Sequence, residues 1–312
     1  MSETAFIFPG QGAQYIGMGK ELADNFKVAR ETFQEADEAL KFSISSLCFN
    51  GPEEELKLTP NTQPAILTAS IAALRVLSSE TGINPVLLAG HSLGEYSSLI
   101  TAQALNFSDA VQIVRLRGKF MQEAVPAGEG TMAAILGLEA DEVQDICRQS
   151  AQEEVVSPAN FNSSWQIVIS GHTEAVSRAV ENALERGAKK AVMLAVSAPF
   201  HCSLMKPAAE KLKEALQDVP VCDIHIPVIS NADARPYPSK EEIKNLLVKQ
   251  VNHPVRWEES MREMVAKGVK TVIEIGPGKV LTGLMRRITK EVKTLNLEDL
   301  KGLKEISQQN RG

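Results

Sequence analysis

The sequence has few of the features that mark exported, membrane-spanning or metal-binding proteins. Its 312 residues include four cysteines, which are scattered along the chain and form no CxxC pair. The first residues carry no basic charge, and no apolar run approaches the roughly 18 residues of a membrane span. We therefore expect a cytoplasmic protein that has reduced thiols, makes no membrane contact and binds no metal.

An excess of basic charge is also absent. Lys and Arg number 33 against 39 Asp and Glu, which gives a formal net charge of −6. This balance argues against nucleic acid as a partner. Hydrophobic residues make up 44% of the chain and charged residues 23%, as in a soluble globular protein, and the length predicts about two domains.

Short apolar runs alternate with stretches of helical periodicity, which predicts an α/β fold with a mostly parallel sheet flanked by helices. The strands expected in this sheet are residues 4–8, 85–90, 226–230, 271–275 and 294–297. The helices expected around it are residues 20–40, 62–79, 93–104, 108–125 with Ser108 as its cap, 203–218, 240–251 and 256–268.

The middle of the chain has a different rhythm. Strands are predicted at 132–138, 155–161, 166–170 and 191–196, and helices at 140–151 and 173–187. Their order, β-α-β-β-α-β, is typical of a ferredoxin-like unit. We expect this unit to be a subdomain at 127–200, entered through a linker at 126–130 and inserted into a large domain formed by residues 1–126 and 201–312.

The first candidate for chemistry is the G-x-S-x-G pattern of residues 90–94, which falls between a predicted strand and a predicted helix. In this context Ser92 would sit on a sharp turn with its hydroxyl exposed at the carboxyl end of the strand. The start of the new helix would offer free backbone N–H groups to a developing negative charge. The alternative is a simple glycine turn with no catalytic role.

A serine nucleophile needs a base, and the chain has five histidines. His201 lies where the chain returns from the inserted subdomain to the large domain, so a cleft between the two would hold it. The other four have structural interpretations or unsuitable positions: His91 beside the serine, His172 at a helix start, His225 in a predicted strand and His253 in a loop.

Arg117 is the third candidate because it lies on the apolar stripe of the predicted helix at 108–125, between Val114 and Met121. A buried guanidinium needs an anionic partner. That partner could be an internal Asp or Glu, or the carboxylate of a substrate held by both arms of the guanidinium. The sequence leaves both interpretations open.

Two glycine-rich loops follow predicted strands. The first, at 8–14, does not match a phosphate-binding loop, because Tyr15 or Met18 stands where the pattern needs Gly or Lys. Gln11 in this loop could present its backbone N–H to the same site as Ser92, or it could be filler in a tight turn. The second loop, Gly276-Pro277-Gly278, could approach the site or be a plain turn.

An α/β-hydrolase would use the same serine motif. However, its elbow follows several strands, whereas only residues 4–8 precede it here. It also needs an acidic residue between the serine and the histidine in chain order, and no Asp occupies a suitable strand end. A non-catalytic binding protein is the other alternative, and full activity of a Ser92→Ala variant would favour it.

Several segments taken in order resemble the malonyl-CoA:acyl-carrier-protein transacylases. They run from about residue 4 to about residue 290 and depart from the family pattern at Ser163-Ser164-Trp165, where many relatives have Ser-Pro-Gly. The matching segments are FPGQGAQ at 8–14, GHSLGEY at 90–96, RGKF at 117–120 with 121–126, NFN at 160–162 with QIVI at 166–169, PFH at 199–201 with SLM at 203–205, Gln250 with PVRW at 254–257, and GPGK at 276–279.

The resemblance implies a role for each matching site residue. Ser92 would carry the malonyl ester, His201 would be its base, and the backbone carbonyl of Gln250 would orient the histidine. Arg117 would hold the malonyl carboxylate. The resemblance also implies that the backbone N–H groups of Gln11 and Leu93 form the oxyanion hole, that Asn160 and Asn162 line the cleft, and that Phe200 favours malonyl over methylmalonyl groups.

The resemblance further implies the partners. Malonyl-CoA would be the donor and the phosphopantetheine thiol of acyl carrier protein the acceptor, in fatty acid synthesis, with no cofactor. We expect a monomer. Because acyl carrier proteins are acidic and this chain is also net negative, a local basic patch would be needed for docking. Lys189-Lys190 and Arg286-Arg287 with Lys290 are candidates, although each could be an ordinary solvated surface residue.

Overall fold

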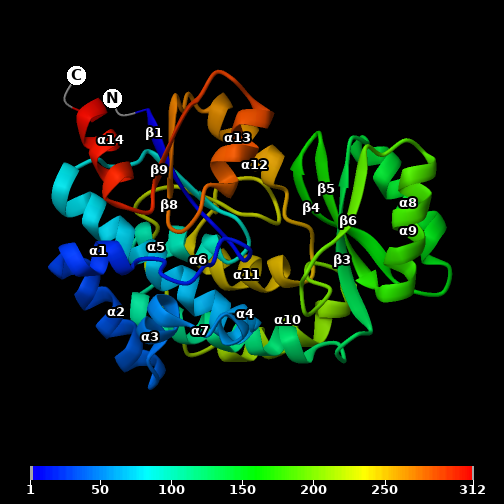
Figure 1. The fold of residues 1–312 in the computed structure, drawn as a ribbon, viewed down its shortest axis with the longest axis horizontal. Coiled ribbons are helices and arrows are strands. Elements are labelled where there is room, and N and C mark those ends of the chain that lie inside the picture. The colour runs from blue at the N-terminus through cyan, green and yellow to red at the C-terminus, as the bar shows by residue number, and fades with distance from the viewer. Residues whose placement is uncertain (1–2, 311–312) are drawn as a thin grey trace.

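The computed structural model describes residues 3–310 and contains two sheets, which lie on opposite sides of the molecule (Figure 1). The larger sheet is parallel throughout, as predicted, and its strand order is β7-β2-β1-β8-β9. Its strands are β1 (Thr4–Phe8), β2 (Leu87–Gly90), β7 (Val228–Ile229), β8 (Thr271–Ile275) and β9 (Lys293–Leu297).

The central strands of this sheet are covered on both faces, and β1 and β2 are accordingly almost continuous apolar runs. Ala5 and Ile7 of β1 belong to the core formed with α12 (Trp257–Ala266) and α13 (Val280–Ile288). Phe6 and Phe8 belong to the core on the other face, which includes most of the buried residues of α5 (Thr59–Thr81). The remaining helices of this part are α1 (Lys20–Asn25), α2 (Lys27–Leu40), α3 (Ile44–Asn50), α4 (Glu53–Lys57), α6 (Gly94–Thr101), α7 (Phe107–Glu123), α10 (Lys206–Ala215), α11 (Ile243–Val251) and α14 (Leu300–Asn310), with 3₁₀ turns at Ser203–Met205 and Lys240–Glu242.

Several predicted boundaries are wrong for local reasons. The helix predicted at 20–40 is two helices, because Phe26 between them has extended backbone. The cap of α7 is Asn106, whose side chain accepts the N–H of Ser108, so Ser108 is not the cap. The strand predicted at 226–230 is only the two residues of β7, and His225 lies outside it.

The smaller sheet has the predicted element order β-α-β-β-α-β. Its elements are β3 (Gly130–Leu136), α8 (Ala140–Ala151), β4 (Val156–Ser163), β5 (Gln166–His172), α9 (Thr173–Glu185) and β6 (Lys190–Met193). The strands are antiparallel in the order β4-β5-β3-β6, and both helices share an apolar core with them. Gly130 opens β3 and so is not part of a linker, while the subdomain limits at 127–200 stay a prediction.

A backbone bridge joins β4 of the smaller sheet to the loop after α11. Asn160 of β4 pairs in parallel with Val255, which follows α11. The N–H of Phe161 donates to the carbonyl of Val255 (2.9 Å), and the N–H of Val255 donates to the carbonyl of Ala159 (2.8 Å). The smaller sheet is therefore hydrogen-bonded to the larger part beside the carboxyl ends of the parallel strands.

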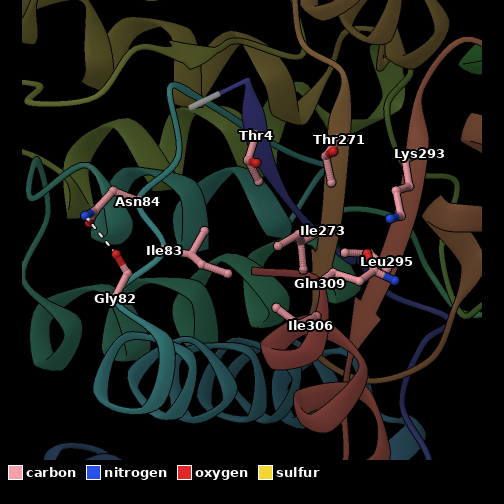
Figure 2. Close-up of a pocket in the computed structure, with 10 residues that line it drawn as sticks. All are labelled: Thr4, Gly82, Ile83, Asn84, Thr271, Ile273, Lys293, Leu295, Ile306 and Gln309. Atoms are coloured by element: carbon pink, nitrogen blue, oxygen red, sulfur yellow. Dashed lines mark hydrogen bonds between the residues drawn. The ribbon is translucent and has the colours of Figure 1, made fainter. Parts of the chain in front are cut away.

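A cavity of about 380 Å³ opens at the other end of the parallel strands, where Thr4, Thr271 and Lys293 begin β1, β8 and β9 (Figure 2). Ile306 and Gln309 of α14 line another side of it. Parallel sheets bind ligands at the carboxyl ends of their strands, so this cavity lies away from the expected site. Within residues 3–310, no helix has the length and hydropathy that crossing a bilayer requires.

Candidate active site

Ser92 occupies the sharp turn between β2 and α6. Its backbone is left-handed (φ 51°), a conformation that is strained for a residue other than glycine and is common at functional sites. The two motif glycines make this turn possible by close backbone approach. A Cβ on Gly90 would lie 1.9 Å from the carbonyl of Gly94, and a Cβ on Gly94 would lie 2.1 Å from the carbonyl oxygen of Phe8 in β1.

His201 lies directly against the serine, although the two residues are 109 positions apart. Its Nε2 is 2.8 Å from Ser92 Oγ, and its Nδ1 is 2.8 Å from the carbonyl oxygen of Gln250. Because a carbonyl only accepts, Nδ1 carries the hydrogen and Nε2 presents its lone pair to the serine hydroxyl. Burial, together with the positive charge of Arg117, lowers the pKa of His201 to about 3, so the imidazole is neutral near pH 7.

Arg117 is fully buried in α7 and points at the same hydroxyl. Its Nη2 donates to Ser92 Oγ (3.1 Å) and to Gln250 Oε1 (2.9 Å), and its Nη1 donates to Gln63 Oε1 (2.7 Å). Among residues 3–310, no carboxylate forms an ion pair with it, and its Nε has no hydrogen-bond partner. The internal ion pair that the sequence left open is therefore not formed. Burial lowers the pKa of this guanidinium, because a charge out of water is destabilised unless an anion compensates it.

Two backbone N–H groups beside Ser92 are free to receive a negative charge. The N–H of Ser92 itself is occupied, because it donates to Asn231 Oδ1 (2.6 Å). By contrast, the N–H groups of Gln11 and Leu93 find no acceptor within the described part of the chain. The Gln11 loop is packed tightly against the serine turn, since a Cβ on Gly10 would lie 2.4 Å from the carbonyl oxygen of His91.

These groups line a cavity of about 110 Å³. Ser92, His201, Arg117, Gln11 and Leu93 form its polar side. Its apolar side is formed by Met121, Met132, Leu194, Val196 and Phe200.

A second cavity, of about 200 Å³, shares four lining residues with the first and so adjoins it. The shared residues are Gln11, His91, Asn160 and Leu194. Asn162 lines the second cavity, and its Oδ1 accepts a hydrogen bond from His91 Nε2 (2.8 Å). The sequence therefore identified residues of both cavities, with Asn160 at their junction.

The second glycine-rich loop, residues 276–278, is not among the residues that line these two cavities. The N–H of Gly278 donates to Glu298 (2.8 Å), and the backbone of Gly276 is left-handed (φ 131°). A Cβ on Gly276 would lie 2.3 Å from Ser70 Oγ and 3.0 Å from Pro9. This loop is a close-packed turn that supports the strand end before Gln11.

Sequence reasoning missed four buried polar residues of the site: Gln63, Glu95, Asn231 and Tyr237. One signal for them was available. Asn231 directly follows a predicted strand, and the carboxyl ends of parallel strands meet at one edge, where Ser92 also lies. Gln63 and Glu95 are helical residues whose burial only the packed structure reveals.

Comparisons with known proteins find similar sequences and structures over almost the whole chain. The sequence model of the acyl transferase domain family matches residues 5–309. Malonyl CoA-acyl carrier protein transacylase of Bacillus subtilis is 53% identical over 300 residues, which cover 96% of this chain and 94% of that protein. The Escherichia coli K12 protein of the same name is 49% identical over 92% of this chain and 93% of its own length.

Solved structures are equally similar. The structure of the transacylase of that name from Coxiella burnetii has a TM-score of 0.98 and 42% identity, and covers 100% of this chain and 98% of that one. A malonyl-transacylase solved in complex with its type II polyketide acyl carrier protein has a TM-score of 0.97 and 46% identity, and covers 99% of this chain and 100% of its own.

Proposed function

Because this chain belongs to the acyl transferase domain family, we propose that it transfers a malonyl group from malonyl-CoA to the phosphopantetheine thiol of an acyl carrier protein. The observation that carries this proposal is the juxtaposition of Ser92, a neutral His201 and a buried Arg117 that forms no ion pair with any carboxylate of residues 3–310. A nucleophile and base account for acyl transfer, and an uncompensated cation accounts for a dicarboxylic acyl group.

In the first half-reaction, Ser92 Oγ attacks the thioester carbonyl while His201 Nε2 takes the hydroxyl proton. The N–H groups of Gln11 and Leu93 stabilise the tetrahedral oxyanion, and donors of this kind are typically worth about 3 kcal/mol each. The C–S bond then breaks, and the CoA thiol leaves with the proton held by His201. Malonyl-Ser92 remains as an ester.

In the second half-reaction, the phosphopantetheine thiol enters the same cavity and gives its proton to His201. Its sulfur attacks the ester carbonyl, and Ser92 leaves with the proton. The covalent intermediate makes the kinetics ping-pong. The product supplies malonyl units for fatty acid synthesis. We propose that the protein acts as a cytoplasmic monomer without a cofactor.

Arg117 gives the proposed selectivity. Malonyl carries a carboxylate that can accept from both arms of the guanidinium, whereas an acetyl group would leave the buried cation unpaired. Sites built around a buried polar group reject ligands that cannot satisfy it. The narrow cavity between Met121, Met132 and Phe200 favours a small acyl group.

The carrier would dock on a basic patch beside the second cavity. Arg287 donates to Gln166 Oε1 (3.2 Å), and Gln166 lines that cavity. Lys189 lies over the ring of the neighbouring Trp165 (4.3 Å to the centroid). We propose that this patch, with Lys190, Arg286 and Lys290, attracts an acidic carrier to the mouth of the cavity.

Mass spectrometry after brief exposure to malonyl-CoA tests the proposal. We expect a malonyl adduct on Ser92 that is absent in Ser92→Ala and that disappears when carrier protein with its phosphopantetheine arm is added. Higher salt should slow its disappearance, because screening weakens attraction between exposed charges. No adduct, or the same adduct in Ser92→Ala, would contradict the proposal.

A further inference from the structure

Glu95 is a fully buried carboxylate that the proposed mechanism does not use. It lies at the start of α6, three residues after Ser92. Its Oε2 accepts the backbone N–H of Asn231 (3.0 Å) and the side-chain Nε2 of Gln250 (2.6 Å), and its Oε1 accepts the hydroxyl of Tyr237. Its acceptor sites are thus met by donors from two segments distant in sequence.

The Gln250 amide joins Glu95 to Arg117. One hydrogen of its NH₂ group is donated to Glu95 and the other to the carbonyl of Ser92 (2.9 Å), while its Oε1 accepts Arg117 Nη2 (2.9 Å). If the amide turned by 180°, its NH₂ group would face the guanidinium. Its oxygen would then face the carboxylate of Glu95 and the carbonyl of Ser92. A donor would thus face a donor, and an acceptor would face an acceptor, so these hydrogen bonds would be lost.

We propose that Glu95 is a positioning residue that sets acyl selectivity by fixing the orientation of the Gln250 amide and, through it, the guanidinium of Arg117. This inference rests on the proposed malonyl transfer. Burial raises the pKa of Glu95 to about 7, although its hydrogen bonds and the charge of Arg117 oppose that rise. In its ionised form Glu95 holds the amide of Gln250 more firmly than the neutral carbonyl of Ser92 does, because a hydrogen bond to a carboxylate is stronger than one to a neutral carbonyl.

The Gln250 amide between Glu95 and Arg117 also explains why the acid does not pair directly with the buried arginine. A carboxylate bonded directly to Arg117 would occupy the position that a substrate carboxylate needs. With the amide between them, Glu95 lies close enough to steady the guanidinium but leaves that position free. The same carboxylate binds the N–H of Asn231, whose side chain holds the N–H of Ser92 and the carbonyl of Gly90.

The test compares kcat/KM for malonyl-CoA and acetyl-CoA in the full-length protein and three variants. Glu95→Ala removes the acceptor. Glu95→Gln keeps an oxygen at the Oε2 position and can place its NH₂ group toward Tyr237, whose hydroxyl can turn to accept. Tyr237→Phe is the matched control, because it removes a buried bond to Glu95 without touching Gln250.

We expect Glu95→Ala to lower the malonyl-to-acetyl ratio of kcat/KM at least tenfold. Glu95→Gln and Tyr237→Phe should stay within about threefold of the wild-type ratio, whatever their stability. Equal losses for both acyl groups in Glu95→Ala would show a structural role, and a Glu95→Gln ratio as low as that of Glu95→Ala would exclude orientation as the cause. Either result overturns the inference.

Two further points keep the test decisive. If Glu95→Ala does not fold, Glu95→Asp replaces it, because aspartate keeps the charge but is one methylene too short to reach Gln250, and the same fall in the ratio is expected. A wild-type protein that does not transfer malonyl would refute the proposed function. A wild-type protein that does, with an unchanged ratio in the variants, would refute only this inference.

Discussion

Replacing Arg117 with alanine should change which acyl group the protein transfers. In the resting site Arg117 donates to Ser92, Gln63 and Gln250, and no carboxylate pairs with it in the described part of the chain. Removing one partner of a desolvated charge pair costs about 2–5 kcal/mol, which is roughly 30- to 5,000-fold in kcat/KM for malonyl-CoA. An acetyl group makes no such pair, so its kcat/KM should change by less than about tenfold, or rise because no buried charge is left unpaired.

The assay measures transfer of both acyl groups to the carrier by wild type, Arg117→Ala and Arg115→Ala. Arg115 is the matched control, because it lies on the same helix but donates to the carbonyl of Leu40 and stacks on Phe42 (4.1 Å to the centroid), away from the cavity. It should keep the wild-type preference. Thermal unfolding of each variant shows whether the protein is folded. An equal fall for both acyl groups in a folded Arg117→Ala protein would refute the reasoning.

Two other predictions follow from burial and close packing. With a pKa of about 3, His201 stays neutral above pH 5, so the pH profile of kcat/KM should show no acid-side inflection near 6.5. The lowered pKa also predicts that the unfolding free energy of wild type falls, relative to that of His201→Asn, as the pH is lowered from about 6.5 to 3. Urea titrations of both proteins over this pH range measure the difference. Gly94→Ala should lower the unfolding free energy by about 3 kcal/mol, because the added Cβ would clash with the Phe8 carbonyl. Gly283→Ala should raise the unfolding free energy by up to about 1 kcal/mol, because the added Cβ in α13 would meet open space and alanine favours the helix.

Much of the fold was predictable because the strands that matter are buried on both faces. Residues 4–8 and 271–275 match β1 and β8 to the residue, and the rhythm of the smaller sheet gave its element order. The short helices α3 and α4 were not predicted, because seven and five residues hold too little of a helical period to stand out. Phe26, which separates α1 from α2, interrupts no apolar pattern and so left no signal.

The site was predictable only where a local pattern carried it. The glycines around Ser92 are required by backbone contacts with their neighbours, so the motif has a physical basis in the turn itself. The interpretation of Arg117 stayed open, because only the packed structure shows which groups surround it. Glu95 and Asn231 meet across 136 residues of chain, and no spacing in the sequence encodes that contact.

The bridge between β4 and Val255 has a mechanical consequence. Val255 lies five residues beyond Gln250, whose carbonyl accepts the hydrogen bond from His201. A rotation of the smaller sheet would therefore also move Gln250 and misalign the imidazole. A bending motion between the two sheets would therefore displace the proposed proton acceptor. In the proposed mechanism, both thiols would therefore enter a cavity of fixed shape, and its small volume of about 110 Å³ would protect the ester from hydrolysis without a closing lid.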